Sequence, residues 1–341
     1  MNGTPKPKSG SGRRTNLALL ILIPSAMVTG LVANTAGTTW GIHPAVYHGV
    51  VAFAVVLLTP WKQVIVRRGL RRWRKSTWVS LGLLFVVLAT VTTGIVHAVG
   101  YRGRIGPLTL MQVHIGAALI ALVLMWLHYR AHPVSFKREV DMSRRGFLRN
   151  AGFAALAGVI WVGAEGVLDV VGASGGRRRF TGSHERGSFD PDRLPVTSWL
   201  DDRVQNIDAS VWSVDVAGRS MTLAEIETLP HDRFDAVLDC TSAWYSEQEW
   251  SGVRLDRLVE AGTRRSIEVR SETGYARRFP VRDLERLWLV THVGGEPLKA
   301  GHGYPARIVA PDRRGFWWVK WVVSITPSHV PWWVQSPFPV T

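Results

Sequence analysis

Three long stretches without a charged residue constrain the fold of this chain more than any other feature. No Asp, Glu, Lys or Arg occurs in residues 15–61, 76–101 or 105–129. A bilayer crossing needs about 20 apolar residues, and its backbone groups must be hydrogen-bonded within the segment, as in a helix. The first stretch is long enough for two crossings, with turn-forming Asn, Gly and Pro at 34–37 and 41–44. We therefore expect four transmembrane helices, near 16–34, 45–66, 76–100 and 106–129. A water-soluble helical core is the alternative, which stretches of this length disfavour.

The net charge of +15 resides entirely in the first half of the chain: residues 1–172 carry +15 and residues 173–341 carry zero. If four helices alternate, one side of the membrane receives four basic residues from the tail, seven from the 62–75 loop and six from 130–149. The other side receives only Arg102 and Arg104. Because cytoplasmic loops are rich in Lys and Arg, the N-terminus is predicted to be cytoplasmic. The charge is explained by topology, and no nucleic-acid partner is needed to account for it.

A fifth, weaker apolar segment covers residues 150–172 and contains Glu165 and Asp169. It follows the sequence SRRGFLR at 143–149, which resembles a twin-arginine export signal. That resemblance implies export of a folded domain, often with its cofactor, although such signals normally lie at an N-terminus. The alternative is an ordinary basic flank before a membrane helix. Both interpretations place residues 174–341 outside the cytoplasm, and we favour a retained fifth helix over cleavage near residue 173.

Three histidines, His48, His97 and His114, lie near the outer ends of the second, third and fourth predicted helices. Ionisable side chains inside a membrane are costly and usually functional. Two of the three could be the axial ligands of a haem b, and the sequence does not choose between them. The alternative is that they cap helix ends or form hydrogen bonds between helices.

A fourth histidine, His128, shares a helix face with His114 at about 21 Å along the axis. This spacing resembles the two-haem helix of membrane b-type cytochromes. The second and third helices offer no histidine at the depth of His128, where Lys62 and Leu83 stand instead. One outer haem is therefore better supported than two.

The second half of the chain predicts a soluble α+β domain that is mainly β. We expect a helix at 222–227, capped by Thr222 with Glu225, and a second at 255–261. Gly294-Gly295 suits a tight hairpin. No dinucleotide, nucleotide or zinc-protease motif and no paired CxxC occurs. The predicted strands lie at 211–216, 234–240, 267–269, 288–292, 307–310 and 317–325. The predicted organisation is a tail at 1–15, a four-helix transmembrane domain at 16–132, the arginine-rich segment and fifth helix at 133–173, and the extracytoplasmic domain at 174–341.

The single cysteine, Cys240, ends a predicted strand and opens the loop 241–245. A lone cysteine is usually a small buried hydrophobic residue. Here it belongs to the first of four sequence blocks, which cover 240–255, 271–275, 301–307 and 315–321. The first block reads CTSAWY and then WSGVRL, the second SETGY, the third GHGYPAR, and the fourth starts at Gly315 and ends in VKW.

In order and spacing, these blocks resemble the sulfite-oxidase family of molybdopterin enzymes over about residues 195–330. The resemblance implies that the Cys240 thiolate ligates molybdenum, for which a soft sulfur donor is suited. It implies that Tyr275 lies beside the metal and can donate a hydrogen bond or proton to substrate. Cations suit the anionic phosphate of the pterin, and a glycine permits close backbone approach. The positions that match the pterin-binding residues are His302, Gly303, Arg307, Lys320 and Trp321.

The sequence departs from the sulfite-oxidising members at the residues after the cysteine. Those members place basic residues there, whereas residues 241–244 of this chain are Thr, Ser, Ala and Trp. This argues against sulfite as substrate. The nearer analogy is the bacterial branch that reduces methionine sulfoxide in proteins and works with a separate haem membrane protein.

We therefore expect a molybdenum-dependent oxidoreductase anchored in the cell membrane, with its catalytic domain outside the cytoplasm. It would transfer an oxygen atom on a small or protein-borne S/N-oxo substrate and exchange electrons through a membrane haem, a quinone or a redox partner. Two alternatives remain open: the helices serve only as an anchor, or the second half is a non-catalytic binding module. The substrate and the direction of electron flow also remain open.

Overall fold

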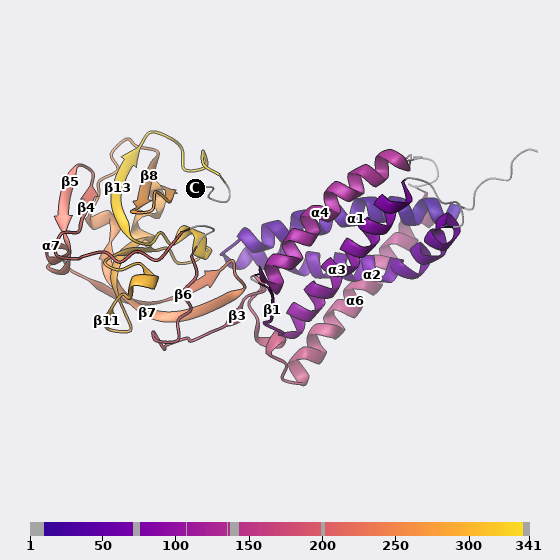
Figure 1. Cartoon of the computed structure of the whole chain (residues 1–341), viewed down its shortest axis with the longest axis horizontal. Coiled ribbons are helices and arrows are strands. Elements are labelled where there is room, and N and C mark those ends of the chain that lie inside the picture. The colour runs from indigo at the N-terminus through magenta and orange to yellow at the C-terminus, as the bar shows by residue number, and fades with distance from the viewer. Residues whose placement is uncertain are drawn as a thin grey trace, which may run out of the picture. The chain divides into compact units, whose positions relative to one another are not determined.

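A computed structural model describes residues 10–70, 76–106, 108–134, 136, 143–198 and 202–336. The chain forms two compact units, Met1–His184 and Glu185–Thr341, and Figure 1 labels many of their elements. The first unit is helical and the second is built mainly from two β-sheets.

Within the described residues, five helices of the first unit are long and apolar enough to cross a membrane. The four predicted helices are confirmed, and the first two extend beyond their predicted ends at both termini. The fifth helix contains most of the weaker apolar segment predicted at 150–172. The helices are α1 (Gly10–Thr35), α2 (Ile42–Leu70), α3 (Thr77–Val99), α4 (Leu110–Ala131) and α6 (Arg144–Val170).

Consecutive helices pack in pairs, α1 against α2 and α3 against α4, whereas α6 packs against the distant α2. Gly49 is where α6 approaches α2, because a Cβ there would lie 2.2 Å from Nε1 of Trp161. The short strands β1 (Arg104–Ile105) and β2 (Leu108–Thr109) connect α3 to α4. Large apolar side chains such as Phe85 and Val159 are exposed on the helices, as expected for a surface that faces lipid.

Helix α6 begins at Arg144, before the predicted start at Asn150, because Ser143 caps it by accepting a hydrogen bond from Gly146 N at 3.2 Å. The paired arginines therefore lie in the first turn of the helix. Near its other end, Glu165 forms an ion pair with Arg178 at 2.5 Å. That pair compensates one of the two acidic side chains in this apolar helix. Arg178 directly follows the 3₁₀ helix η2 (Ser174–Arg177).

The second unit contains a six-stranded and a five-stranded sheet. In the described pairings β13 runs parallel to β4, and the others are antiparallel. The six-stranded sheet comprises β3 (His184–Glu185), β6 (Asp232–Cys240), β7 (Trp244–Arg254), β10 (Trp288–Val293), β11 (Glu296–Pro297) and β12 (Arg307–Val309). The five-stranded sheet comprises β4 (Ser213–Val216), β5 (Arg219–Thr222), β8 (Ser266–Ser271), β9 (Ala276–Pro280) and β13 (Val322–Ser328).

One hydrophobic core draws on both sheets. Val214 and Ile325 of the five-stranded sheet and Leu289 and Ile308 of the six-stranded sheet are all fully buried in it. The mixed, mainly β class predicted from the sequence is therefore confirmed.

Two local predictions are also confirmed. Helix α7 (Leu223–Glu227) carries the expected capping box, in which Thr222 and Glu225 exchange backbone-to-side-chain hydrogen bonds at 2.7 and 3.3 Å. Gly294 and Gly295 form the β10–β11 turn with φ of 59° and 82°, which favours glycine at both positions.

Two predicted elements in the second unit are wrong. The helix expected at 255–261 is only the 3₁₀ turn η3 (Leu255–Arg257), because Leu255 and Val259 enter the core while Gly262 turns the chain with φ of 53°. The strand expected at 317–325 starts only at Val322. The preceding residues form the 3₁₀ helix η6 (Gly315–Trp317), and Trp321 has a left-handed φ of 49°.

Candidate functional site

Cys240 is the last residue of β6 and pairs with Trp244 of β7 across a tight hairpin. Ala243 in the hairpin has a left-handed φ of 69°. The thiol is buried, with 9% of the residue exposed, and Ser242 N lies 3.5 Å from Sγ as a donor. The two-strand ladder therefore fixes the position of the sulfur.

A buried ion pair between Arg314, which directly precedes η6, and Asp239 lies beside the cysteine. Arg314 donates to the carboxylate of Asp239 and, at 3.1 Å, to the carbonyl oxygen of Cys240. Gly315 permits this approach, because a Cβ there would lie 3.2 Å from Cys240 Cα. Sequence reasoning missed this pair. The available signal was an acidic residue beside the cysteine and an arginine directly before the glycine of the fourth block.

Two cations lie near the cysteine without an acidic partner within hydrogen-bonding distance in the described part of the chain. Arg307 of β12 is 1% exposed and donates to the carbonyl oxygens of His302 at 3.1 Å and Trp318 at 3.3 Å. Its Nε is buried and has no hydrogen-bond partner among the described residues. Lys320 Nζ donates to the carbonyl oxygens of Thr197 at 3.0 Å and Gly301 at 2.6 Å.

The electrostatics of these cations place them in one group with the cysteine. Burial lowers the pKa of Arg307 to about 9 and, together with the nearby Arg307 charge, the pKa of Lys320 to about 7. A thiolate charge at Cys240 raises the pKa of both. Asp202 also raises the pKa of Lys320, but the hydrogen bonds that both cations make among the described residues go to carbonyl oxygens, so the positive charge is incompletely compensated. An anionic group bound here would be stabilised.

The remaining predicted pterin-binding residues surround these cations. His302 is 3% exposed, and burial together with the Arg307 charge lowers its pKa to about 4, so the ring is neutral at pH 7. Gly303 has a left-handed φ of 105°, and a Cβ there would lie 3.1 Å from the Cβ atoms of Arg307 and Lys320. Trp321 Nε1 donates to Ala300 O at 2.8 Å, and Lys320 Nζ lies 5.3 Å from the Trp321 ring centroid. The structure brings these five sequence-predicted residues together.

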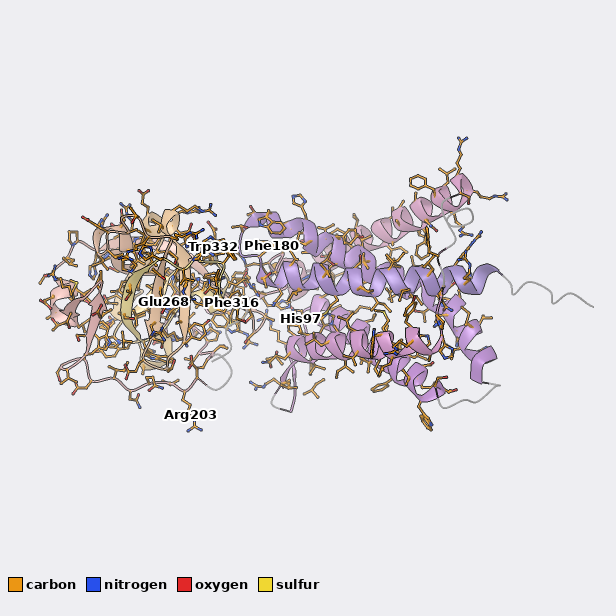
Figure 2. The ribbon with its side chains drawn as sticks, turned by 90° about the horizontal axis from the view of Figure 1, so that it is seen from above. His97, Phe180, Arg203, Glu268, Phe316 and Trp332 are labelled. Atoms are coloured by element: carbon orange, nitrogen blue, oxygen red, sulfur yellow. The ribbon has the colours of Figure 1, made fainter. Side chains whose placement is uncertain are left out.

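Tyr275 lies between β8 and β9, and its hydroxyl donates to the carbonyl oxygen of Phe316, which is labelled in Figure 2. Burial raises the pKa of Tyr275, so the phenol stays protonated at neutral pH. Phe316 directly follows Gly315, which packs on Cys240 Cα. A short stretch of backbone thus connects the tyrosine hydroxyl to the cysteine.

The helical unit places two of its histidines in matching environments. His48 Nδ1 lies 2.8 Å from Ala26 O, and His114 Nδ1 lies 2.8 Å from Thr90 O. Since a carbonyl oxygen can only accept, each Nδ1 carries the hydrogen, and in the neutral ring each Nε2 then keeps its lone pair. The two ring centroids are 6.1 Å apart.

A glycine lies beside each of these rings, one helical turn after the accepting carbonyl. A Cβ at Gly30 would lie 2.9 Å from His48 Cε1, and a Cβ at Gly94 would lie 2.9 Å from His114 Cε1. The pattern is therefore the same on α1 and α3: a carbonyl orients the ring, and a glycine four residues later makes room for it.

His97, the third predicted haem ligand, has different partners within the first unit. Its Nε2 donates to Gly182 O at 2.7 Å, and its ring centroid lies 4.9 Å from that of His184. Figure 2 labels His97 of α3 and also Phe180, which belongs to the same chain segment as Gly182. The structure therefore pairs His48 with His114 and leaves His97 out of that pair.

At the depth of His128, the described part of α2 and α3 contributes other polar groups. His128 Nδ1 lies 2.9 Å from Ser80 Oγ. Lys62 Nζ donates to Asn16 Oδ1 at 3.0 Å. This arrangement provides no facing histidine of α2 or α3 at that level.

Comparisons with known proteins agree with the β-rich site. Residues 201–332 match the family described as the oxidoreductase molybdopterin binding domain. The chain is 24% identical over 176 residues to the uncharacterized oxidoreductase YuiH of Bacillus subtilis (strain 168), covering 46% of this chain and 88% of that protein. It also aligns with the sulfane dehydrogenase SoxCD from Paracoccus pantotrophus, with a TM-score of 0.35 and 19% identity over 37% of this chain and 40% of that one.

The matched range contains Cys240, Tyr275 and all five predicted pterin-binding residues. The second unit therefore carries a sulfite-oxidase-like molybdopterin-binding domain, and the protein is a molybdenum-dependent oxidoreductase. The family resemblance predicted from the four sequence blocks is confirmed for this domain.

Proposed function

We propose that this oxidoreductase is anchored in the cell membrane and transfers an oxygen atom to or from sulfur or nitrogen in a small or protein-borne substrate. It exchanges the two electrons of that reaction through a haem or quinone in the helical unit. The observation that carries the proposal is the grouping of the only cysteine with two cations that have no carboxylate at hydrogen-bonding distance among the described residues.

The residues present fit a molybdenum–molybdopterin group. Cys240 offers a soft thiolate donor to the metal. Arg307 and Lys320 are positioned to hold an anionic phosphate, and the unsatisfied Nε of Arg307 is one donor still available for it. The neutral His302 adds no further positive charge, and Gly303 lets the backbone approach closely. When bound, the group supplies the two-electron redox change that oxygen-atom transfer requires.

The substrate side of the site favours a neutral oxo group. The hairpin residues 241–243 that follow Cys240 bring no cation, which disfavours a dianion such as sulfite. Tyr275 is protonated and can donate a hydrogen bond to a substrate oxygen by giving up its bond to Phe316 O. An S-oxide or N-oxide, which carries partial negative charge on oxygen, suits these groups.

The membrane part of the proposal rests on the five apolar helices and on the distribution of basic residues along the chain. The N-terminus is cytoplasmic, and the molybdopterin domain lies outside the cytoplasm. The paired arginines in the first turn of α6 act as a twin-arginine-type signal for export of the folded domain, and α6 remains as an anchor.

His48 and His114 fit a haem b better than any pair that includes His97. Both rings are oriented by a carbonyl through Nδ1, the usual arrangement of a histidine that ligates metal through its other nitrogen. The two ring centroids lie 6.1 Å apart, so both side chains could contribute to holding one haem. A haem held there would carry single electrons.

Metal and haem quantification on the full-length protein tests this proposal. Inductively coupled plasma mass spectrometry should find about one molybdenum per chain, and a pyridine haemochrome assay about one haem b, when cells supply both cofactors. Protein with molybdenum but without haem would make the helices a simple anchor. Near-zero molybdenum would overturn the proposed chemistry and favour a non-catalytic binding module. If molybdenum is present, reduction of a panel of S-oxides and N-oxides by reduced viologen tests the substrate class.

A further inference from the structure

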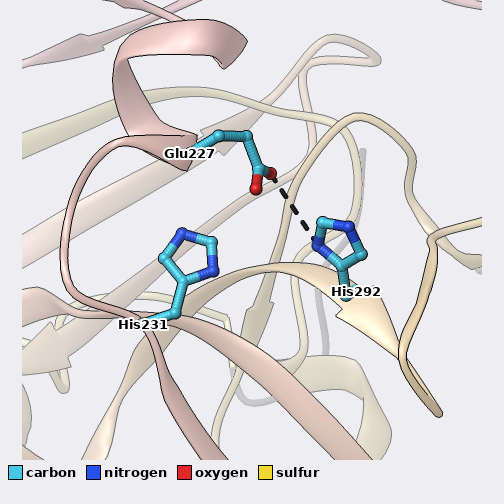
Figure 3. Close-up of side chains that lie close together, drawn as sticks. All are labelled: Glu227, His231 and His292. Carbon is cyan, nitrogen blue, oxygen red and sulfur yellow. Dashed lines mark ion pairs between the residues drawn. The ribbon is translucent and has the colours of Figure 1, made fainter.

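A second group of metal-binding side chains lies in the molybdopterin domain, away from Cys240. Glu227, His231 and His292 each offer one ligand atom, and these atoms all lie within 4.8 Å of one another (Figure 3). Glu227 Oε1 and His292 Nδ1 are 3.8 Å apart, and the two imidazole centroids are 6.5 Å apart. We propose that these three residues bind a divalent zinc-type cation that joins α7 to the six-stranded sheet.

The backbone brings the three residues together from separate elements. Glu227 is the last residue of α7, whose start is fixed by the capping box. His231 directly precedes β6, and His292 lies in β10. These two strands flank β7 at the same level, because Asp232 pairs with Gly252 while His292 pairs with the adjacent Ser251. The two histidines are therefore placed by sheet register.

The donor set suits zinc. Two imidazole nitrogens and one carboxylate oxygen are ligands that Zn²⁺ prefers, and three protein ligands leave a fourth position for water. Tetrahedral bonds of about 2.0–2.1 Å place ligand atoms about 3.4 Å apart. The Glu227–His292 pair is already near that separation, and His292 Nδ1 would exchange its 2.9 Å contact with Thr291 Oγ1 for the ion.

The wider gaps in the cluster can close by rotation of one side chain. The Glu227 side chain is 35% exposed and makes no hydrogen bond within the described residues, so it can turn toward the ion. His231 Nε2 lies 3.2 Å from Ile226 O, to which it donates. This bond leaves Nδ1 of His231 with a lone pair for the metal.

The zinc site is separate from the molybdenum site. The two ends of β6 are Asp232, beside the proposed zinc site, and Cys240. At about 3.3 Å per residue, they lie about 26 Å apart along the strand. The proposal therefore does not depend on the proposed molybdenum chemistry, and a bound zinc would stabilise the domain by tying α7 to β6 and β10.

Isothermal titration of full-length, chelator-treated protein with Zn²⁺ tests the site. The variants are His231→Ala, His292→Ala and Glu227→Gln. The matched control is His329→Ala, which removes an exposed histidine outside the cluster. Because other histidines can bind zinc, the informative quantity is the difference from the unmodified protein. Removal of a ligand should weaken the tightest site at least about tenfold, since even outer-shell changes cost 10–100-fold. The control should leave that site unchanged.

X-ray absorption at the zinc edge gives an independent readout. Protein loaded with one equivalent should show two imidazoles at about 2.0–2.1 Å. The proposal stands only if all three cluster variants weaken the tightest site and the spectrum contains histidine. Unchanged binding in any of them overturns it, and Glu227→Gln guards against misfolding because it alters one exposed side chain. Molybdenum content, measured on the same samples, reports separately on the proposed function.

Discussion

The two units of this protein differ in the charge of the buried side chains that hydrogen-bond to carbonyl oxygens. In the helical unit, His48 and His114 each hydrogen-bond to one carbonyl oxygen through a neutral ring. In the molybdopterin domain, Arg307 and Lys320 also hydrogen-bond to carbonyls, but they are cations with no carboxylate at hydrogen-bonding distance among the described residues.

This difference shows what each region is prepared to bind. A neutral, oriented imidazole costs little to bury and presents a lone pair, which suits a metal or haem iron. An uncompensated cation is costly to bury, and the cost is recovered when an anion arrives. The first unit thus provides metal ligands, whereas the second provides a charge balance that is complete only with an anionic cofactor.

The largest expected effect comes from Cys240→Ser, which tests the cysteine thiolate in the molybdopterin domain. Replacing a soft sulfur ligand by oxygen should lower viologen-coupled activity by more than about 100-fold. Ser242→Ala in the same hairpin is the control and should retain activity. A Cys240→Ser protein with full molybdenum content and full activity would show that the cysteine is not a ligand.

The next largest effect is expected from His48→Ala and His114→Ala, which test the two imidazoles of the helical unit. Each should reduce haem content to less than about a tenth, because loss of a residue that would hold the haem should cost at least as much as the 10–100-fold of outer-shell changes. His97→Ala should retain haem, since its ring bonds to Gly182 O instead. The haemochrome assay measures all three, and haem loss in His97→Ala with retention in His48→Ala would contradict the pairing.

A smaller effect is expected from pH in cofactor-free protein. The folded-state pKa of Lys320 is about 7, below its ordinary 10.5, so the unfolded chain binds more protons between these values. The stability of the domain should therefore rise with pH across this range, by at most about 1.4 kcal/mol per unit.

Lys320→Met should remove this slope, whereas Lys299→Met, at an exposed lysine paired with Asp192, should not. The apparent unfolding midpoint followed by tryptophan fluorescence from pH 7 to 9 measures the slope, because above this range the lowered pKa of Arg307 adds to it. Equal slopes in the unmodified protein and in Lys320→Met would refute the proposed cost of this cation.

The smallest effect is expected from Gly30→Ala and Gly94→Ala, which sharpen the comparison within the helical unit. The added methyl would lie 2.9 Å from a histidine ring atom. Displacing the ring should cost about 1–3 kcal/mol and partly reduce haem occupancy or shift its absorption bands. Gly116→Ala is the matched control, because nothing lies within 4 Å of its Cβ position. If Gly116→Ala changed haem occupancy or the absorption bands as much, the effect would come from helix packing in general and not from contact with the histidine rings.

Local signals predicted much of the fold. The uncharged stretches located the first four helices, and Thr222 with Glu225 predicted α7 and its cap. Predictions failed where distant contacts decide the conformation. The 255–261 segment has helical periodicity, yet burial of Leu255 and Val259 limits it to one 3₁₀ turn. No local pattern predicts the Asp239–Arg314 pair or the Glu227 cluster, since Arg314 and His292 lie far along the chain from their partners.

The sequence by itself determined the number of apolar helices, the location of the excess charge and the four blocks around the only cysteine. These are properties of composition and spacing, which local chemistry expresses directly. Only the tertiary structure decided which histidines pair and which cations, among the described residues, have no carboxylate at hydrogen-bonding distance. The packing of α1 on α2 and of α3 on α4 brings one carbonyl and one glycine to each imidazole. The sheet in turn buries Arg307 among carbonyls, and no spacing rule along the chain encodes either arrangement.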